Sequence, residues 1–263
     1  MNNYKSAPVE NLVTLENLES SSDIFAHLLK RHQDKFPDDG TENKWKCPQI
    51  TIIFGSGDMN QAAEAIVKDL SHTMGSGLIT SVLVEEYVRD DMIKKIRAKL
   101  IPMDERLKIH PNYLKSVNLI DRMNCSTIHI EEYEEADTKK QYGHRKKGSP
   151  IVVLDFPQYY FGESSAIITM SAFKNLDELI MLYRRERLSF DSISVWSSKL
   201  AQCFDLVTRI PQGVHWTFNY KSISTKSPLQ FSLPNSEVSI MQNIHFETLS
   251  TAGNIKTIAF QIK

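Results

Sequence analysis

This sequence predicts an α/β fold in which helices flank a mostly parallel sheet. The first observation is that short β-branched runs alternate with amphipathic segments of about ten residues or more, as in chains whose parallel strands are joined by helices. The second is that hydrophobic residues make up 41% of the 263 residues, which is enough to bury a sizeable core.

The first half of the chain begins with a strand-like run at 12–17. A predicted helix at 20–36 follows it, with Ser or Asp available as its cap. "QITIIF" (49–54) is a β-branched run suited to a buried strand, and apolar side chains behind the next Ser/Asp cap recur at helical spacing. These apolar residues are Met59, Ala62, Ala63, Ile66, Val67 and Leu70. The predicted elements are strands at 12–17, 49–54 and 78–84 and helices at 20–36, 56–74, 89–101 and 112–123.

The second half continues the alternation after a charged stretch, 131–149, which is acidic first and then basic. We interpret this stretch as a solvated connection rather than a binding tail. Val- and Ile-rich runs again predict strands, and apolar periodicity predicts two helices. The predicted elements are strands at 126–133, 150–156, 165–173, 192–197, 213–220 and 255–263 and helices at 175–188 and 198–210.

Charge and composition exclude several classes of function. Lys plus Arg total 31 and Asp plus Glu total 32, which gives a formal net charge of −1. A charge this close to zero does not favour binding to nucleic acid or to an anionic membrane. No segment approaches the roughly 18 apolar residues of a membrane helix, and the first residues have no apolar signal-peptide core. Cys47, Cys125 and Cys203 are too far apart for a disulfide framework or a zinc site, which points to a reducing cytoplasm.

Three short motifs favour structural interpretations. "GESSA" (162–166) is similar to a nucleophile elbow, with Asp205 and His215 or His245 downstream, but it leads into a strand where an elbow leads into a helix. "SAFK" (171–174) has S-x-x-K spacing that many strand ends share. His129 with Glu131 and Glu132 suggests no third metal ligand, so a solvated strand face is expected.

A serine between two glycines, in "MGSGLITSVLVEE", is the strongest candidate site. From Glu42 onward the chain resembles the catalytic half of the aldehyde dehydrogenase superfamily. "ENKWKCP" falls on the glutamate segment of that family, with Glu42 at the general-base position. "MGSG" falls on the nucleophile turn, with Ser76 where the family has cysteine and Ser81 where it has arginine.

The resemblance extends to the end of the chain, but the site motifs depart from the family pattern. A serine hydroxyl is a weaker nucleophile than the family's thiolate, and no histidine is obviously placed to activate Ser76. "QYYFGES" keeps Phe161 and Gly162 of the nicotinamide-ribose motif without its glutamate. The oxyanion asparagine that the resemblance implies is replaced by Phe218, and Asn219 comes one residue late, which on a strand turns a side chain to the other face.

The resemblance also implies a domain organisation and two alternative functions. Residues 1–41 would be a strand–helix remnant of the cofactor domain and its linker, and 42–263 a catalytic-type domain with C-terminal strands of the kind that pair across subunits. We expect a non-catalytic binding or assembly subunit that needs no cofactor and forms a homo-oligomer, or a hetero-oligomer with a full-length aldehyde dehydrogenase. The alternative is an active NAD- or NADP-dependent oxidoreductase, or a weak esterase through Ser76.

Overall fold

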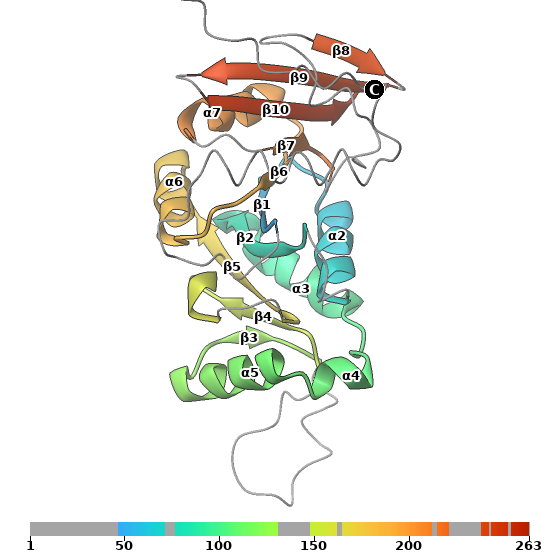
Figure 1. Ribbon diagram of the computed structural model, residues 1–263, viewed down its shortest axis with the longest axis vertical. Coiled ribbons are helices and arrows are strands. Elements are labelled where there is room, and N and C mark those ends of the chain that lie inside the picture. Colours follow the sequence, from blue (N-terminus) through green and yellow to red (C-terminus); the bar gives the residue numbers. More distant parts are fainter. Residues whose placement is uncertain are drawn as a thin grey trace, which may run out of the picture. The chain divides into compact units, whose positions relative to one another are not determined.

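The computed structural model describes residues 47–71, 77–130, 148–161, 165–211, 215–220, 238–241, 243–251 and 254–262 (Figure 1). All of them belong to one unit, Asn43–Ile223 with Gln230–Lys263. Its strands form one sheet in the order β3-β4-β5-β2-β1-β6-β7-β10-β9-β8. The strands are β1 (Gln49–Ile53), β2 (Ile79–Glu85), β3 (Thr127–Ile128), β4 (Ile151–Leu154), β5 (Ile167–Phe173), β6 (Ser192–Trp196), β7 (His215–Phe218), β8 (Val238–Met241), β9 (Ile244–Thr251) and β10 (Asn254–Gln261).

The sheet is parallel from β4 to β10, and only β3, β9 and β8 join it antiparallel to their neighbours. This confirms the mostly parallel α/β fold. The α-helices are α2 (Met59–Ser71), α3 (Arg89–Lys99), α4 (Glu105–Lys108), α5 (Pro111–Met123), α6 (Leu176–Arg185) and α7 (Leu200–Arg209). Two 3-10 helices, η2 (Glu86–Val88) and η5 (Gln158–Phe161), follow β2 and β4.

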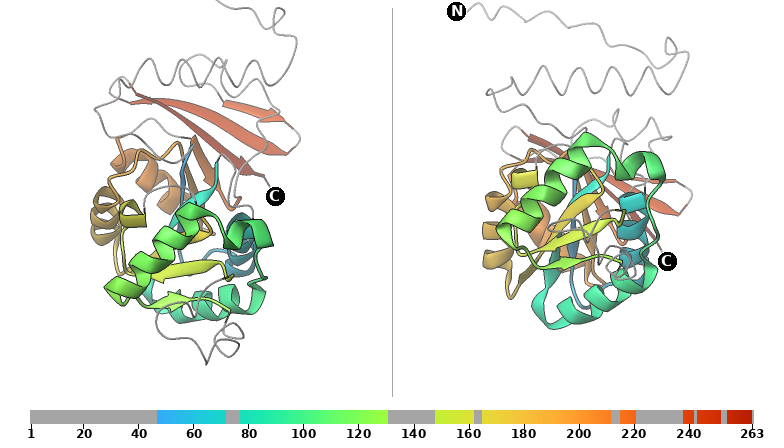
Figure 2. Two further views of the ribbon diagram at one scale, coloured as in Figure 1. Left: turned by 60° about the horizontal axis from the view of Figure 1, so that its bottom comes forward. Right: turned by 90° about the horizontal axis from the view of Figure 1, so that it is seen from below.

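Helices cover both faces of the sheet. Ile52 of β1 belongs to a core with side chains of α6 and α7, whereas its neighbour Ile53 belongs to a core with α2 and α3. Adjacent residues of a strand point to opposite faces, so the two helix pairs lie on opposite sides. A third core joins α5 to β4, and in Figure 2 the green α5 lies against the yellow-green strands at that end.

Helix α2 is capped at its N-terminus by an aspartate, as the sequence predicts. The Asp58 Oδ1 atom accepts hydrogen bonds from the backbone N–H groups of Asn60 and Gln61, each at 3.0 Å, and these bonds hold the pKa of Asp58 below its usual value. Five of the six apolar residues expected on its inner face, all but Met59, are buried, which confirms the periodicity.

The C-terminal strands extend the sheet of their own chain. The pairing across subunits that the resemblance implies stays a prediction, and within the chain strand β10 pairs with β7. The buried Lys256 of β10 fixes this arrangement, because its Nζ donates to the backbone oxygens of Val207 and Ile210 at the end of α7, the second at 2.5 Å. Helix C-termini favour a cation, although burial lowers the pKa of Lys256.

Most predicted elements are present, and α4 was not predicted. The strand expected at 126–133 is described only as β3, and β8 and β9 were not predicted. The strand at 12–17 and the helix at 20–36 lie outside the described residues. Of the charged stretch, Gly148 and Ser149 are described and buried, which is contrary to a solvated connection at this end. None of the helices in the described ranges combines the length and apolarity that crossing a bilayer requires.

Candidate functional site

The turn before β2 is the site that the sequence singles out. Ser76 and Glu42 both lie outside the described residues. The described flank begins at Gly77, which has a φ of +70° that favours glycine. The buried Asp69 of α2 accepts a 2.8 Å hydrogen bond from the backbone N–H of Ile79, and this bond fixes the start of β2 against the helix.

A buried carboxylate lies beside the next part of β2. Ser81, at the position where the resemblance places an arginine, donates to Glu186 Oε1 at 3.0 Å and lies 3.3 Å from the hydroxyl of Thr169 on β5. The other carboxylate oxygen of Glu186 accepts from the backbone N–H of Gln158 at 2.7 Å. Glu186, which is only 1% exposed, therefore joins β2 and η5 to the end of α6.

Glu186 is held without a cation on either carboxylate oxygen among the described hydrogen bonds. Burial raises the pKa of Glu186, and the bonds from Gln158 and Ser81 and the charge of Arg185 oppose that rise. Arg185 itself donates to Ser171 at 3.0 Å. Among the described residues, the Oε1 atom of the fully buried Gln158 has no hydrogen-bond partner. The network around Glu186 is therefore suited to holding β2, η5 and the end of α6 together. The Oε1 atom of Gln158 is an acceptor that the described part of this network does not use.

The raised pKa predicts a pH-dependent stability. In the unfolded chain the pKa of Glu186 returns to its ordinary 4.5, so between 4.5 and the raised value the folded protein binds more protons. The free energy of unfolding contributed by Glu186 therefore falls as pH rises through this window. We expect Glu186→Gln to flatten this slope in urea unfolding measured from pH 4.5 upward. Identical slopes for both proteins would contradict the assignment.

A second polar cluster lies at the carboxyl ends of the central strands. After β1, Ser56 Oγ lies 3.0 Å from Ser197 Oγ, and the backbone N–H of Gly55 donates to Glu85 Oε2 at 2.8 Å. After β7, the Asn219 side chain accepts from Ser197 N at 2.9 Å and donates to Ser197 O at 2.8 Å. These residues follow the carboxyl ends of β1, β2, β6 and β7, whereas the Ser76 turn precedes the amino end of β2.

The structure thus separates two positions that the resemblance would bring to one site. Strands β1, β2, β6 and β7 are parallel and in register, so Ile79 lies level with the start of β7 and Asn219 follows its end. A strand of five residues spans about 16 Å. Asn219 is therefore far from the described flank of the turn, and Phe218 is buried in the core.

The remaining sequence candidates do not assemble into a catalytic group. Ala166 leads directly into β5, which confirms that "GESSA" precedes a strand, while Ser164 lies outside the described residues. Asp205 binds Arg209, at 3.1 Å through each carboxylate oxygen, and not a histidine. His129 Nδ1 is 3.1 Å from the Thr127 hydroxyl. Within the described ranges no three His, Cys, Asp or Glu residues are placed to hold a metal ion.

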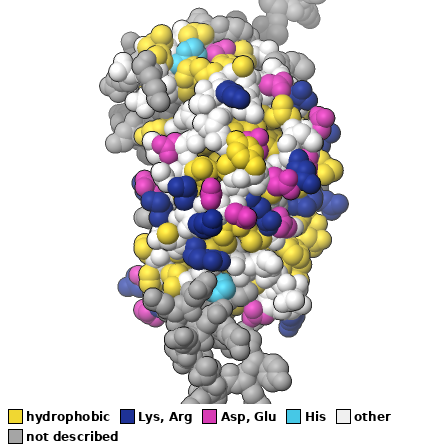
Figure 3. Space-filling model, turned by 180° about the vertical axis from the view of Figure 1, so that it is seen from behind, with side chains coloured by type: hydrophobic (Ala, Val, Ile, Leu, Met, Phe, Trp, Pro, Cys, Tyr) yellow, Lys and Arg dark blue, Asp and Glu magenta, His cyan; other side chains and the backbone are white. Residues whose placement is uncertain are grey.

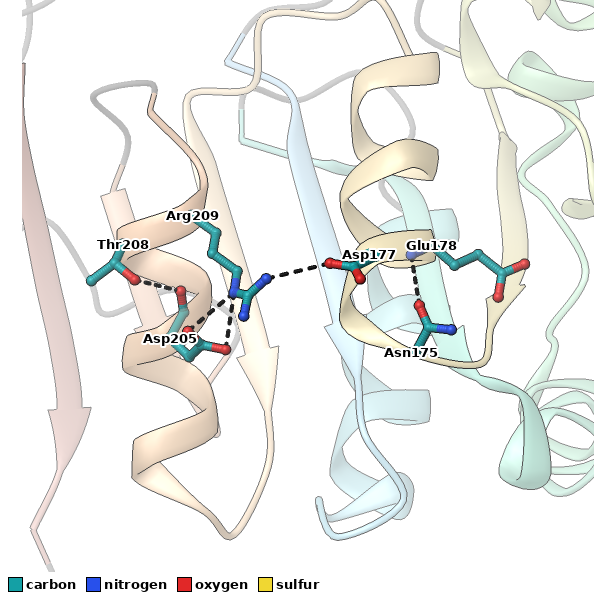
Figure 4. Close-up of polar contacts among 6 residues, drawn as sticks. All are labelled: Asn175, Asp177, Glu178, Asp205, Thr208 and Arg209. Atoms are coloured by element: carbon teal, nitrogen blue, oxygen red, sulfur yellow. Dashed lines mark hydrogen bonds and ion pairs between the residues drawn. The ribbon is translucent and has the colours of Figure 1, made fainter.

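A groove of about 460 Å³ lies on the surface of α6 and α7, lined by Asp177, Ile180, Met181, Arg184 and Arg209. Figure 4 shows Arg209 between two carboxylates: Asp205 on its own helix, and Asp177 on α6 at 3.4 Å. Asn175 in the same view caps α6 by accepting from the Glu178 N–H. Exposed pairs of this kind contribute little to stability. We interpret the groove as a salt-bridged helix surface.

Charges of both signs are interspersed on the face shown in Figure 3, where Lys and Arg lie among Asp and Glu. This distribution agrees with the near balance of 31 basic and 32 acidic residues. No single-sign patch dominates that face.

Several solved structures are similar to this chain. An NAD-dependent aldehyde dehydrogenase from Sinorhizobium meliloti is 19% identical with a TM-score of 0.46, over 66% of this chain and 37% of that one. An NADP-dependent glyceraldehyde-3-phosphate dehydrogenase from Bacillus halodurans is 14% identical with a TM-score of 0.46, over 74% and 41%. An NAD-dependent benzaldehyde dehydrogenase from Corynebacterium glutamicum is 14% identical with a TM-score of 0.49, over 70% and 41%.

The chain therefore spans between 37% and 41% of the length of these three proteins. Two of them are named as aldehyde or benzaldehyde dehydrogenases, the family that the sequence resembles. No curated protein matches the sequence. A family model matches residues 44–263, which is most of the chain, and the protein therefore belongs to the family described as "Protein of unknown function (DUF1487)".

Proposed function

We propose that this chain is a non-catalytic binding or assembly subunit with an aldehyde dehydrogenase-like catalytic-domain fold. The observation that carries the proposal is the placement of Asn219. Its side-chain N–H donates to Ser197 O and its carbonyl oxygen accepts from Ser197 N. An amide that stabilises an oxyanion needs an N–H directed at the substrate, and here one N–H and the carbonyl oxygen of the amide are used to join β6 to β7.

The surroundings of Ser81 support the same proposal. In the family an arginine occupies this position, as the resemblance implies, whereas here a short hydroxyl binds Glu186. Ser81 and Glu186 are both buried, so they form part of the structural interior of the sheet. Two positions that no longer match the family's site, 81 and 218, are buried in the core, as expected of a fold kept without the family's chemistry.

The glycine turn that follows β1 does not fit the phosphates of a dinucleotide. A glycine turn between a strand and a helix is the usual place for a pyrophosphate, and the turn at 54–58 between β1 and α2 has this form. A Cβ atom at Gly57 would lie 2.5 Å from the backbone oxygen of Trp196. The glycine therefore allows close packing on β6, and it does not open a space for phosphate.

The proposal includes a partner and a location. An assembly subunit would form a homo-oligomer or join a full-length aldehyde dehydrogenase, and the exposed Val238, Ile240 and Ile255 of the C-terminal strands support such association. The three cysteines form no disulfide with one another, which supports a location in the cytoplasm, because disulfides are rare in a reducing compartment.

Calorimetric titration of NAD and of NADP into the purified chain tests the proposal. We expect no heat of binding at millimolar cofactor, and equal hydrolysis of a nitrophenyl ester by the wild type and Ser76→Ala. Saturable cofactor binding with aldehyde-dependent NADH formation would overturn the proposal. So would ester hydrolysis that Ser76→Ala abolishes, because it would make Ser76 a nucleophile.

A further inference from the structure

Helix α6 has a second face with a regular pattern, besides the one that faces the core. Its core face consists of Leu179, Leu182 and Tyr183, which are buried. Four other residues recur at positions i, i+3, i+4 and i+7, so they lie along one side of the helix, and they line the groove beside α7. These four residues, which we call the outer stripe, are Asp177, Ile180, Met181 and Arg184.

The middle of the outer stripe is apolar and open to solvent. Met181 is 61% exposed, and Ile180 is only half-buried although it packs against the core. A single exposed methionine needs no explanation by itself. Here, however, the two apolar side chains have the spacing by which one helix binds another along its length, and charged side chains lie on either side of them.

The two ends of the outer stripe carry opposite charges. Asp177 is in the first turn of α6 and Arg184 is in the last turn. Figure 4 shows Asp177 directed toward α7, where one of its oxygens binds Arg209 at 3.4 Å, yet its side chain is 93% exposed. Within the described ranges Arg184 has no ion-pair partner, whereas its neighbour Arg185 donates to Ser171 at 3.0 Å. The helix dipole favours an acid and a base at these ends, but it does not place them on the same side of the helix.

The outer stripe is complementary to itself when it is read in the opposite direction. Its order along the helix is acid, apolar, apolar, base. Asp177 and Arg184 are equally far in sequence from the midpoint between Ile180 and Met181. If a two-fold axis passes through that midpoint, Asp177 lies opposite the partner's Arg184 at both ends of the contact. Each contact then occurs twice, as an interface between two identical surfaces requires.

We propose that α6 binds α6 of a second copy of this chain, in antiparallel orientation, through the outer stripe. This inference rests on the proposed role as an assembly subunit and assigns it a docking surface on a helix. A partner with charges of one sign would meet a like charge at one end of the stripe, whereas a second copy meets the opposite charge at both ends. The exposed Met181 of each copy is covered by the apolar middle of the other. One helix face is a small contact, so we expect a weak dimer.

Charge reversal at one end of the stripe tests the pairing by sedimentation equilibrium. Arg184→Asp places two carboxylates opposite each other at both ends of the contact, and Asp177→Arg does the same with two guanidinium groups. We expect either variant alone to raise the dimer dissociation constant at least about tenfold. Arg122→Asp is the matched control and should leave the constant unchanged, because Arg122 is an exposed arginine in the last turn of another helix, α5.

Mixing the two variants separates a lost contact from a lost fold. In an equimolar mixture of Arg184→Asp and Asp177→Arg, one copy presents two acids and the other two bases. Opposite charges then face each other again at both ends, so we expect the mixture to associate about as tightly as the wild type. The ion pair with Arg209 that Asp177→Arg removes is exposed and contributes little to folding.

A wild-type chain that stays monomeric at all concentrations overturns this inference, and so does a mixture that remains dissociated. A dimer that both variants leave unchanged overturns it as well, because another surface then joins the copies. None of these results bears on catalysis. Cofactor binding and ester turnover decide the proposed function separately, so the two failures are distinguishable.

Discussion

Phe218→Asn is expected to lower the free energy of unfolding by about 4 kcal/mol. Phe218 is buried on β7, with ring centroids 5.4 Å from Phe204 and 5.6 Å from Phe260. The substitution restores the residue type that the resemblance implies for this position, but it removes an aromatic side chain from the core and buries an amide. Urea unfolding measures the loss.

Phe218→Leu is the control for this change. It keeps an apolar side chain, so we expect a smaller loss of about 1.5 kcal/mol. If Phe218→Asn were as stable as the wild type and gained aldehyde turnover, position 218 would belong to a catalytic site and our interpretation of it as core would be wrong.

Glu186→Ala is expected to cost about 3 kcal/mol of unfolding free energy. The substitution removes the acceptor of the Ser81 hydroxyl and of the Gln158 N–H. It leaves the Gln158 N–H without that acceptor in the interior, and Ser81 keeps only its 3.3 Å contact with Thr169. The cost of an unsatisfied buried donor exceeds the gain from removing a desolvated carboxylate. Chemical denaturation at neutral pH gives the value.

The matched control is Glu64→Ala on α2, where the glutamate is exposed and forms a 2.8 Å ion pair with Lys99. Its loss is expected to stay within about 0.5 kcal/mol. If the two substitutions had equal effects, Glu186 would not be the tie between β2, η5 and α6 that the contacts indicate.

The interior strands were predictable because burial on both faces favours short runs rich in β-branched and aromatic residues with no charge. "QITIIF" and "SISVW" are such runs, although each includes small or uncharged polar residues, and both became central strands, β1 and β6. Strands β8 and β9 were not predictable in the same way. "IHFETLST" mixes His, Glu and Thr with apolar residues because each face of this hairpin is only partly covered, so its pattern does not differ clearly from that of a loop.

The site was harder to predict because its main residue resembles a surface charge. Glu186 lies in "YRRERL", among arginines that suggest a solvated helix end. Its spacing carried a signal, since Leu179, Leu182 and Tyr183 form the buried stripe of α6 and position 186 continues that stripe. The separation of Asn219 from the turn before β2 could not be read from spacing, because it depends on which end of each strand carries which loop.

The central place of β1 has a consequence for the speed and order of folding. This strand pairs with β2 and also with β6, so Ile53 meets Trp196 across more than half of the chain. Contacts of such long sequence separation slow folding, because a large loop must close before they form. During synthesis β1 and β2 can pair early, but one side of β1 stays open until β6 leaves the ribosome. We therefore expect this protein to depend on chaperones that shield an apolar strand edge during translation.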